Sequence, residues 1–140
     1  MAVKIFVYGT LRKGMYNYDL YLKDKNSFRS YGYVKGTLMT LKDRKYPALL
    51  LEGNDYILGE IHEVDEEFVS SLDDLECYFG ENDIRNEYNK IMCDIYNDKK
   101  NIIEQIPVYV YNDRNSNFAS LLDKVIENGD FVEYISKKSS

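Results

Sequence analysis

The stretch Ile5-Phe6-Val7-Tyr8-Gly9-Thr10-Leu11 determines how the N-terminal part of the chain folds. The β-branched and aromatic residues at positions 3–8 predict a short buried strand. Gly9 ends this strand, and because it has no Cβ, the backbone turns there at low steric cost and a ligand can approach closely. Two interpretations follow. Residues 8–11 form a plain turn, or their backbone N–H groups bind a carboxylate or carbonyl oxygen.

The composition is that of an acidic globular protein. The chain has 140 residues, of which 44% are apolar, and its formal net charge is −6. This length predicts a single domain, residues 1–140, with a hydrophobic core. An acidic chain without a basic block gains no electrostatic attraction to nucleic acid or to an anionic membrane, so we expect neither partner. We also expect no signal peptide and no bilayer span, because every apolar run is too short.

The few cysteines and histidines argue against metal chemistry. Cys77 and Cys93 lack the spacing of metal ligands, and His62 is the only histidine. We therefore predict no metal, reduced cysteines and a cytoplasmic location. For His62 we favour a structural hydrogen bond over catalysis, since most side-chain hydrogen bonds go to backbone or water. Acyl transfer through a covalent intermediate is disfavoured, because no serine or cysteine with a neighbouring base stands out.

Alternating and helical patterns predict a sheet with a few helices. Strands are expected at residues 28–41, 46–51, 56–64, 88–96 and 102–111, with a hairpin turn at 53–55 and an edge or bulge at Pro107. A short helix or turn is expected at 15–22, and helices at 68–76 and 118–126. Asn115 or Ser116 would cap the last helix, Gly129 would end it, and the tail after Tyr134 would be frayed. This order predicts an α+β fold, a small mixed and mainly antiparallel β-barrel with flanking helices.

Glu76 has an unusual position for an acidic residue on an amphipathic helix. Asp65 begins this helix as its N-cap. The apolar side of the helix consists of Phe68, Val69, Leu72 and Leu75. Glu76 falls in the same sector, where lost hydration and the negative end of the helix dipole raise the pKa of a carboxyl group and suit it to proton transfer near neutral pH. The alternative is a glutamate that extends into solvent or pairs with Arg85 or a lysine.

Six motifs occur in one order along the chain. They are Val7-Tyr8-Gly9-Thr10-Leu11-Arg12-Lys13-Gly14, Tyr46-Pro47-Ala48-Leu49, Gly59-Glu60-Ile61-His62-Glu63-Val64-Asp65, Leu72-Asp73-Asp74-Leu75-Glu76, Val108-Tyr109-Val110-Tyr111-Asn112 and Gly129-Asp130-Phe131. In this combination the chain resembles the gamma-glutamylcyclotransferase-like family, most closely its short gamma-glutamylamine branch. The resemblance extends over nearly the whole chain and implies a small mixed barrel with flanking helices.

The resemblance also implies a reaction and the residues that perform it. The α-amine of a γ-glutamyl group attacks its own γ-carbonyl, 5-oxoproline forms, and an amine or amino acid leaves. Because both reactants belong to one molecule, no covalent enzyme intermediate is needed. The family's catalytic glutamate falls on Glu76, which would shuttle the proton, and its substrate-binding loop falls on Tyr8, Gly9, Thr10 and Leu11. No metal, nucleotide or other cofactor is implied.

The sequence departs from the family pattern at two places. Cys77 stands where the family often has glycine, and Tyr88-Asn89-Lys90 stands where it often has Tyr-Arg-Arg. These departures bear on the choice of substrate. The alternative function is a non-catalytic binding module of the same fold, which would recognise a γ-glutamyl-like metabolite or a protein partner. The joint presence of Glu76 and the loop argues against it, because a scaffold requires no carboxylate there. The sequence predicts neither the leaving amine nor the oligomeric state.

Overall fold

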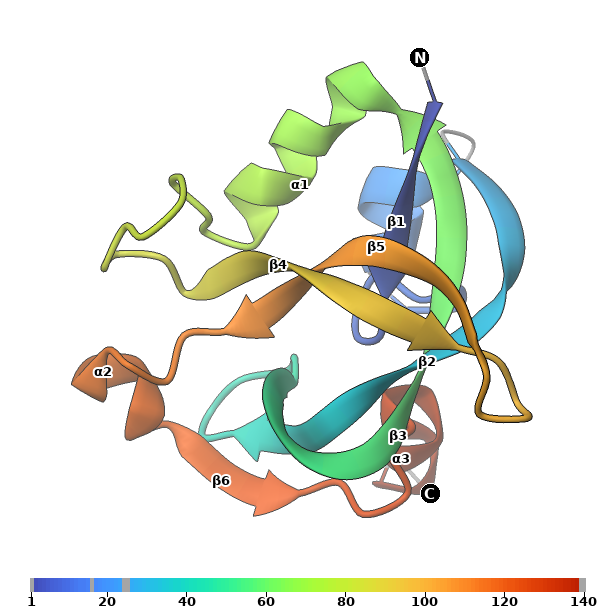
Figure 1. The fold of residues 1–140 in the computed structure, drawn as a ribbon. Coiled ribbons are helices and arrows are strands. Elements are labelled where there is room, and N and C mark those ends of the chain that lie inside the picture. The colour runs from blue at the N-terminus through green and yellow to red at the C-terminus, as the bar shows by residue number, and fades with distance from the viewer. Residues whose placement is uncertain (1, 16, 24–25, 139–140) are drawn as a thin grey trace.

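A strongly twisted antiparallel sheet organises the chain (Figure 1). The computed structural model describes residues 2–15, 17–23 and 26–138. The sheet consists of β1 (Ala2–Val7), β2 (Asn26–Leu41), β3 (Ala48–Asp65), β4 (Tyr88–Tyr96), β5 (Ile102–Tyr111) and β6 (Leu122–Val125). Its hydrogen-bonded order is β1-β3-β2-β4-β5, and β6 pairs with β2. The sheet curls into a barrel-like form without closing, which confirms the predicted α+β class.

Short helices flank the sheet. They are the π-helical turn η1 (Tyr18–Leu22), the 3₁₀ turn η2 (Glu66–Phe68), α1 (Val69–Leu75), α2 (Ser116–Ala119) and α3 (Phe131–Lys138). The Asp65 side chain accepts a hydrogen bond from the Glu67 N–H, which confirms the predicted N-cap. Buried Leu72 of α1 packs with Val7 and Leu22, so α1 and η1 cover the end of β1. Among the described residues, no helix is long and apolar enough to cross a membrane.

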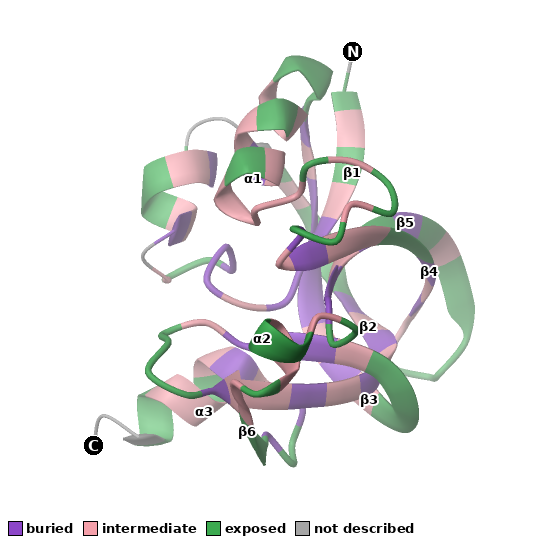
Figure 2. Cartoon of the chain, turned by 90° about the vertical axis from the view of Figure 1, so that its left-hand side faces the viewer, coloured by how far each residue is buried: buried purple, intermediate pink, exposed green. Residues whose placement is uncertain are grey.

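The main core fills the concave side of the sheet, where buried segments of several strands meet (Figure 2). Phe6 of β1 and Ile61 of β3 lie in this core, each about 1% exposed. Gly59 lets β1 approach β3 closely, because a Cβ built there would lie 2.3 Å from Phe6 Cζ and 2.6 Å from the Val7 carbonyl oxygen. The pairing of these strands therefore requires glycine at position 59.

We predict that Gly59→Ala destabilises the fold. The added methyl group collides with a backbone oxygen as well as a ring, so β1 must shift, and overpacking of this kind costs about 1–3 kcal/mol. Urea denaturation followed by circular dichroism measures the loss. Ser70→Ala, a substitution at an exposed position of α1, serves as the control and should leave stability unchanged. Equal stabilities for the two variants would contradict the prediction.

The predicted hairpin at residues 46–64 is wrong. Residues 48–65 form one strand, β3, and both of its halves pair with β2, through Thr37 with Leu50 and Gly36 with Asp55. The four residues between these halves, 51–54, bulge out of the ladder, and Gly53 at φ 104° permits the bend. The sixteen residues of β2 are long enough to pair with both halves, so the glycine bends the strand without reversing it.

The predicted helix at residues 118–126 is also wrong beyond residue 119. The Asn115 side chain caps α2 as predicted, but α2 ends at Ala119, and residues 122–125 form β6. Unpaired backbone groups at the far end of β2 explain the difference, because β6 supplies their partners through Met39–Val125 and Leu41–Leu122. The tail is not frayed after Tyr134, since α3 continues to residue 138.

Candidate active site

A cavity of about 350 Å³ lies where β1 and α1 both end, beside one end of β4 and of β5. Both parts of the site predicted from the sequence line it. They are Glu76 and the loop residues Tyr8, Gly9, Thr10 and Leu11. Strand β1 brings the loop to the cavity, and α1 brings the glutamate from the other side. The fold thus brings together two segments that are far apart in the sequence.

Glu76 is the C-cap residue of α1, and its side chain lines the cavity. Burial raises the pKa of its carboxyl group to about 8, and the nearby negative charge of Glu87 adds to the shift. Among the described residues, no group donates a hydrogen bond or a salt bridge to this carboxylate. Arg85 pairs instead with Asp83 at 2.7 Å, so the alternative ion pair between Arg85 and Glu76 is wrong. A partly desolvated carboxylate is therefore available to a ligand.

The loop after β1 is held by hydrogen bonds to its carbonyl and hydroxyl oxygens. The Gly9 carbonyl accepts the Arg12 N–H, and the Thr10 carbonyl accepts the Tyr18 N–H, at 3.0 and 3.1 Å. The Thr10 hydroxyl accepts a hydrogen bond from the Asn17 amide at 2.8 Å. Within residues 2–15, 17–23 and 26–138, no acceptor engages the N–H groups of residues 9–11. These donors are free to bind an anionic or carbonyl oxygen.

Tyr8 of the loop and two tyrosines that the sequence analysis did not assign, Tyr88 and Tyr109, form one wall of the cavity. The Tyr8 hydroxyl donates to the Tyr109 carbonyl, the Tyr88 hydroxyl to the Pro47 carbonyl, and the Tyr109 hydroxyl to Asp73. Burial raises the pKa of all three phenols, which keeps them neutral. The sequence contains a partial signal for Tyr109, because it alternates with valines in residues 108–111 and so shares one face of β5 with Tyr111. The contribution of Tyr88 depends on the curl of the sheet.

Glu87 is a second carboxylate at the cavity that the sequence analysis missed. It accepts a hydrogen bond from the Tyr46 hydroxyl at 2.7 Å. Its charge is the main electrostatic influence on Glu76, after burial. Glu87 lies between α1 and β4, where no periodic pattern distinguishes it. Its role follows only from the three-dimensional arrangement.

The two departures from the family pattern lie at or beside this cavity. Cys77 lines it with φ 52°, in the left-handed region that favours glycine, so a glycine fits this position naturally. Burial raises the pKa of the Cys77 thiol, which argues against a nucleophilic thiolate. Lys90 forms an ion pair with Asp73 at 2.7 Å and lies over the Tyr109 ring, 5.6 Å from its centroid. Lys90 therefore supports the tyrosine wall.

His62 is fully buried on β3, away from the cavity. Its Nε2 atom shares a hydrogen bond with the Glu60 carboxylate at 2.9 Å. The expected structural hydrogen bond is confirmed. This side chain does not line the cavity that contains Glu76.

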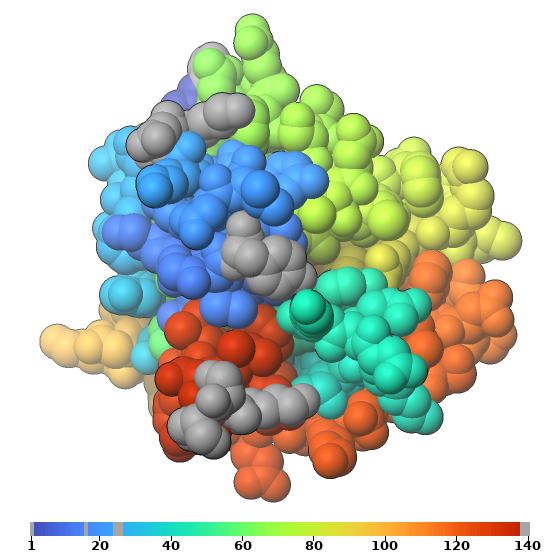
Figure 3. Space-filling view, turned by 180° about the vertical axis from the view of Figure 1, so that it is seen from behind, coloured from blue at the N-terminus to red at the C-terminus, as the bar shows by residue number. Residues whose placement is uncertain are grey.

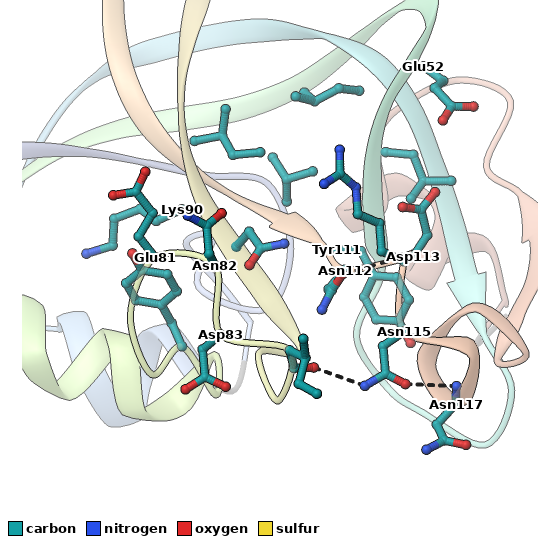
Figure 4. A pocket seen from close by; sticks show the side chains of 18 residues that line it. Glu52, Glu81, Asn82, Asp83, Lys90, Tyr111, Asn112, Asp113, Asn115 and Asn117 are labelled. Atoms are coloured by element: carbon teal, nitrogen blue, oxygen red, sulfur yellow. Dashed lines mark hydrogen bonds between the residues drawn. The ribbon is translucent and has the colours of Figure 1, made fainter.

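A larger hollow of about 800 Å³ lies on the other side of the loop that follows α1 (Figure 4). Its labelled side chains are mainly amides and carboxylates, including Glu81, Asp83 and Asp113. Asp83 is held ionised by Arg85, which lowers its pKa to about 2, so it cannot exchange a proton near neutral pH. Neither Glu76 nor the loop after β1 lines this hollow. We therefore assign the candidate active site to the smaller cavity.

Comparison with known proteins places this geometry in a family. Residues 5–133 match the family described as gamma-glutamyl cyclotransferase, AIG2-like. The gamma-L-glutamyl-butirosin B gamma-glutamyl cyclotransferase of Niallia circulans is 41% identical over 91 residues, covering 65% of this chain and 56% of that protein. The gamma-glutamylaminecyclotransferase of Rattus norvegicus is 38% identical over 79 residues, covering 51% and 53%. The chain spans about half the length of these curated relatives.

Solved structures of similar proteins share the fold of this chain. An AIG2-like protein from Mus musculus superposes with a TM-score of 0.66 at 26% identity, covering 86% of this chain and 84% of that one. YkqA from Bacillus subtilis superposes with a TM-score of 0.70 at 26% identity, covering 100% of this chain and 44% of that one. Together with the match over residues 5–133, these similarities confirm the resemblance drawn from the motifs. The chain belongs to the gamma-glutamyl cyclotransferase, AIG2-like family.

Proposed function

We propose that residues 1–140 act as one cofactor-independent gamma-glutamyl cyclotransferase domain in the cytoplasm. It releases 5-oxoproline and a free amine or amino acid from a γ-glutamyl compound. One observation carries the proposal: a carboxyl group with a pKa of about 8 shares a cavity with loop N–H groups that have no acceptor among the described residues. The names of the relatives from Niallia circulans and Rattus norvegicus support the same reaction class.

Glu76 serves as the proton shuttle. The substrate α-amine is an ammonium at neutral pH, and it becomes a nucleophile when Glu76 accepts its proton. The amine nitrogen then bonds to the γ-carbonyl carbon, and the bond from that carbon to the leaving nitrogen breaks as Glu76 returns the proton to that nitrogen. The second proton of the attacking nitrogen passes by way of Glu76 to the freed amine, which leaves as an ammonium. A pKa of about 8 suits both transfers, because neither direction is strongly uphill near neutral pH.

The remaining cavity groups bind the substrate and the developing charge. The N–H groups of Gly9, Thr10 and Leu11 hold the substrate carboxylate or the oxyanion that forms on the γ-carbonyl oxygen. Glu87 adds a second negative charge, which attracts the substrate ammonium and keeps the Glu76 pKa high. The neutral tyrosines form a wall that does not compete for protons.

The test is a panel of γ-glutamyl-amines and γ-glutamyl-amino acids, each incubated with the protein and assayed for released 5-oxoproline. We expect release from at least one class, and the products identify the leaving group. Calorimetric titration of the same panel distinguishes the alternative, a binding module. Binding without any 5-oxoproline release would contradict the enzymatic function and support the binding module.

The pH dependence of the reaction follows from the raised Glu76 pKa. Because the carboxylate is the base form, kcat/KM should rise about tenfold per pH unit below about pH 8 and then level off. Initial rates of 5-oxoproline release between about pH 5 and about pH 9 measure this limb. If the rate instead rises near the ordinary glutamate pKa of 4.5, Glu76 is not the base.

A further inference from the structure

A buried ion pair lies directly behind the substrate loop. Arg12, at the end of the loop, is 5% exposed, and Glu60 of β3 is 2% exposed. The Arg12 Nε donates to one Glu60 oxygen at 3.0 Å, and the backbone N–H of Lys13 donates to the other at 3.0 Å. His62 Nε2 lies 2.9 Å from the same carboxylate. Neither Arg12 nor Glu60 lines the cavity that contains Glu76.

The same arginine reaches the C-terminal helix. Its Nη1 donates to Asp130 Oδ1 at 2.8 Å. That oxygen also accepts the Glu133 N–H at 3.1 Å, in the first turn of α3. In the space-filling view from behind, the red C-terminal segment lies against the blue N-terminal segment (Figure 3). The guanidinium group of Arg12 therefore connects the loop to β3 and to the start of α3.

Stability alone gives a weak reason for these buried charges. Burial by itself raises the pKa of Glu60, but hydrogen bonds from His62, the Lys13 N–H and Arg12 outweigh it, so the pKa is lowered and the carboxylate stays ionised. Buried ion pairs seldom stabilise a fold more than apolar side chains of similar volume, because desolvation offsets their attraction. What the pair does supply is a fixed geometry for residues 12 and 13, which continue directly from the loop.

We propose that Glu60 and Arg12 are positioning residues, which hold the loop so that the N–H groups of Gly9, Thr10 and Leu11 point into the cavity, with Asp130 linking them to α3. Hydrogen-bond donors stabilise an oxyanion only within about 2.7–3.1 Å, so a small displacement of the loop removes their effect. The inference rests on the proposed function and assigns these donors to the oxyanion that forms on the γ-carbonyl oxygen.

Glu60→Gln is the principal test. Glutamine keeps the shape and one acceptor oxygen, but it cannot satisfy Arg12 and Lys13 together as a carboxylate does. We expect kcat for 5-oxoproline release to fall about 10–100-fold, with KM changed less than about threefold, since a developing oxyanion exists only in the transition state. Asp130→Asn, at a partly exposed side chain, should lower kcat about threefold to tenfold. It serves as the second variant if Glu60→Gln does not fold.

A control separates positioning from general destabilisation. Ile126→Val removes a methyl group from the core beside α3 and should lower the melting temperature while leaving kcat unchanged per folded molecule. If Glu60→Gln and Asp130→Asn both keep the wild-type kcat per folded molecule, the inference is overturned.

Amide signals test the inference independently of turnover. In ¹⁵N-labelled protein, the resonances of Gly9, Thr10 and Leu11 should shift in Glu60→Gln and Asp130→Asn, and should stay in place in Ile126→Val. Unmoved signals in both variants would overturn the positioning role even if the protein is an enzyme. Shifted signals in a protein that releases no 5-oxoproline would support the positioning role and reject the proposed function.

Discussion

Glu76→Gln is expected to lower kcat by about 10⁴-fold, the upper end of the range for loss of a general acid–base group. Glutamine matches glutamate in shape, so packing at the end of α1 should survive, but it cannot accept the proton of the substrate ammonium. One residue serves both proton transfers, so both are lost. Rates of 5-oxoproline release measure the effect, and calorimetry should show that a γ-glutamyl compound still binds.

The same variant should become more stable than the wild type as pH rises. The Glu76 pKa is raised in the folded protein to about 8, above the ordinary value of 4.5, so folding favours the protonated form. This favourable contribution is fully present below about pH 4.5 and is lost as pH rises through about 8. Melting temperatures of the two proteins should therefore agree near about pH 4 and diverge toward about pH 8, with Glu76→Gln higher.

An exposed glutamate provides the control for both measurements. Glu127→Gln removes one negative charge at an exposed position that does not line the cavity, and it should change neither turnover nor the pH dependence of melting. Retained 5-oxoproline release in Glu76→Gln would remove Glu76 from the mechanism. An unfolded Glu76→Gln protein would show that the residue is structural.

Gly9→Val is the second large effect, and we expect turnover to fall more than about 100-fold with most of the fold retained. Even a single Cβ at position 9 would lie 2.9 Å from Pro47 Cδ and 3.0 Å from its Cγ. A branched side chain forces the loop away from Pro47 and carries the neighbouring N–H groups with it. Circular dichroism measures how much of the fold is retained, and 5-oxoproline assays measure the loss of turnover.

A compensating substitution tests that reason. The Cβ of Gly9→Ala collides with Pro47 alone. Adding Pro47→Ala removes the colliding ring atoms, so the double variant should recover part of the activity that Gly9→Ala loses. Near-normal turnover in Gly9→Val, or no difference between the alanine variants, would mean that the loop is only a turn.

Local patterns indicated both halves of the candidate site but left an alternative open for each, and the family resemblance assigned their roles. A strand that ends in glycine exposes backbone donors, and helical periodicity placed Glu76 among apolar residues. Glu87 and Tyr88 were missed because they reach the cavity only through the curl of β4, which depends on distant strands. Arg12 was part of a motif, but its burial against Glu60 has no local signal.

The errors in the fold have a common cause. Residues 46–64 and 118–126 were interpreted from their own sequence, as a hairpin and as a helix. Both segments instead pair with β2, whose sixteen residues extend past β4 and leave backbone groups that require partners. A long neighbouring strand therefore overrode the local preference in each case.

The ties between the first loop and the last helix also constrain when the protein can become active during its synthesis. The loop that contains Gly9 leaves the ribosome well before α3, and Arg12 can bind Asp130 only after a further 118 residues have been translated. The hydrogen bond from the Leu58 N–H to the Gly129 carbonyl likewise forms only after residue 129 has been translated. A nascent chain that stops before α3 would carry Glu76 and the loop but lack this clamp. We therefore expect ribosome-bound chains to gain activity in a late step, as α3 emerges.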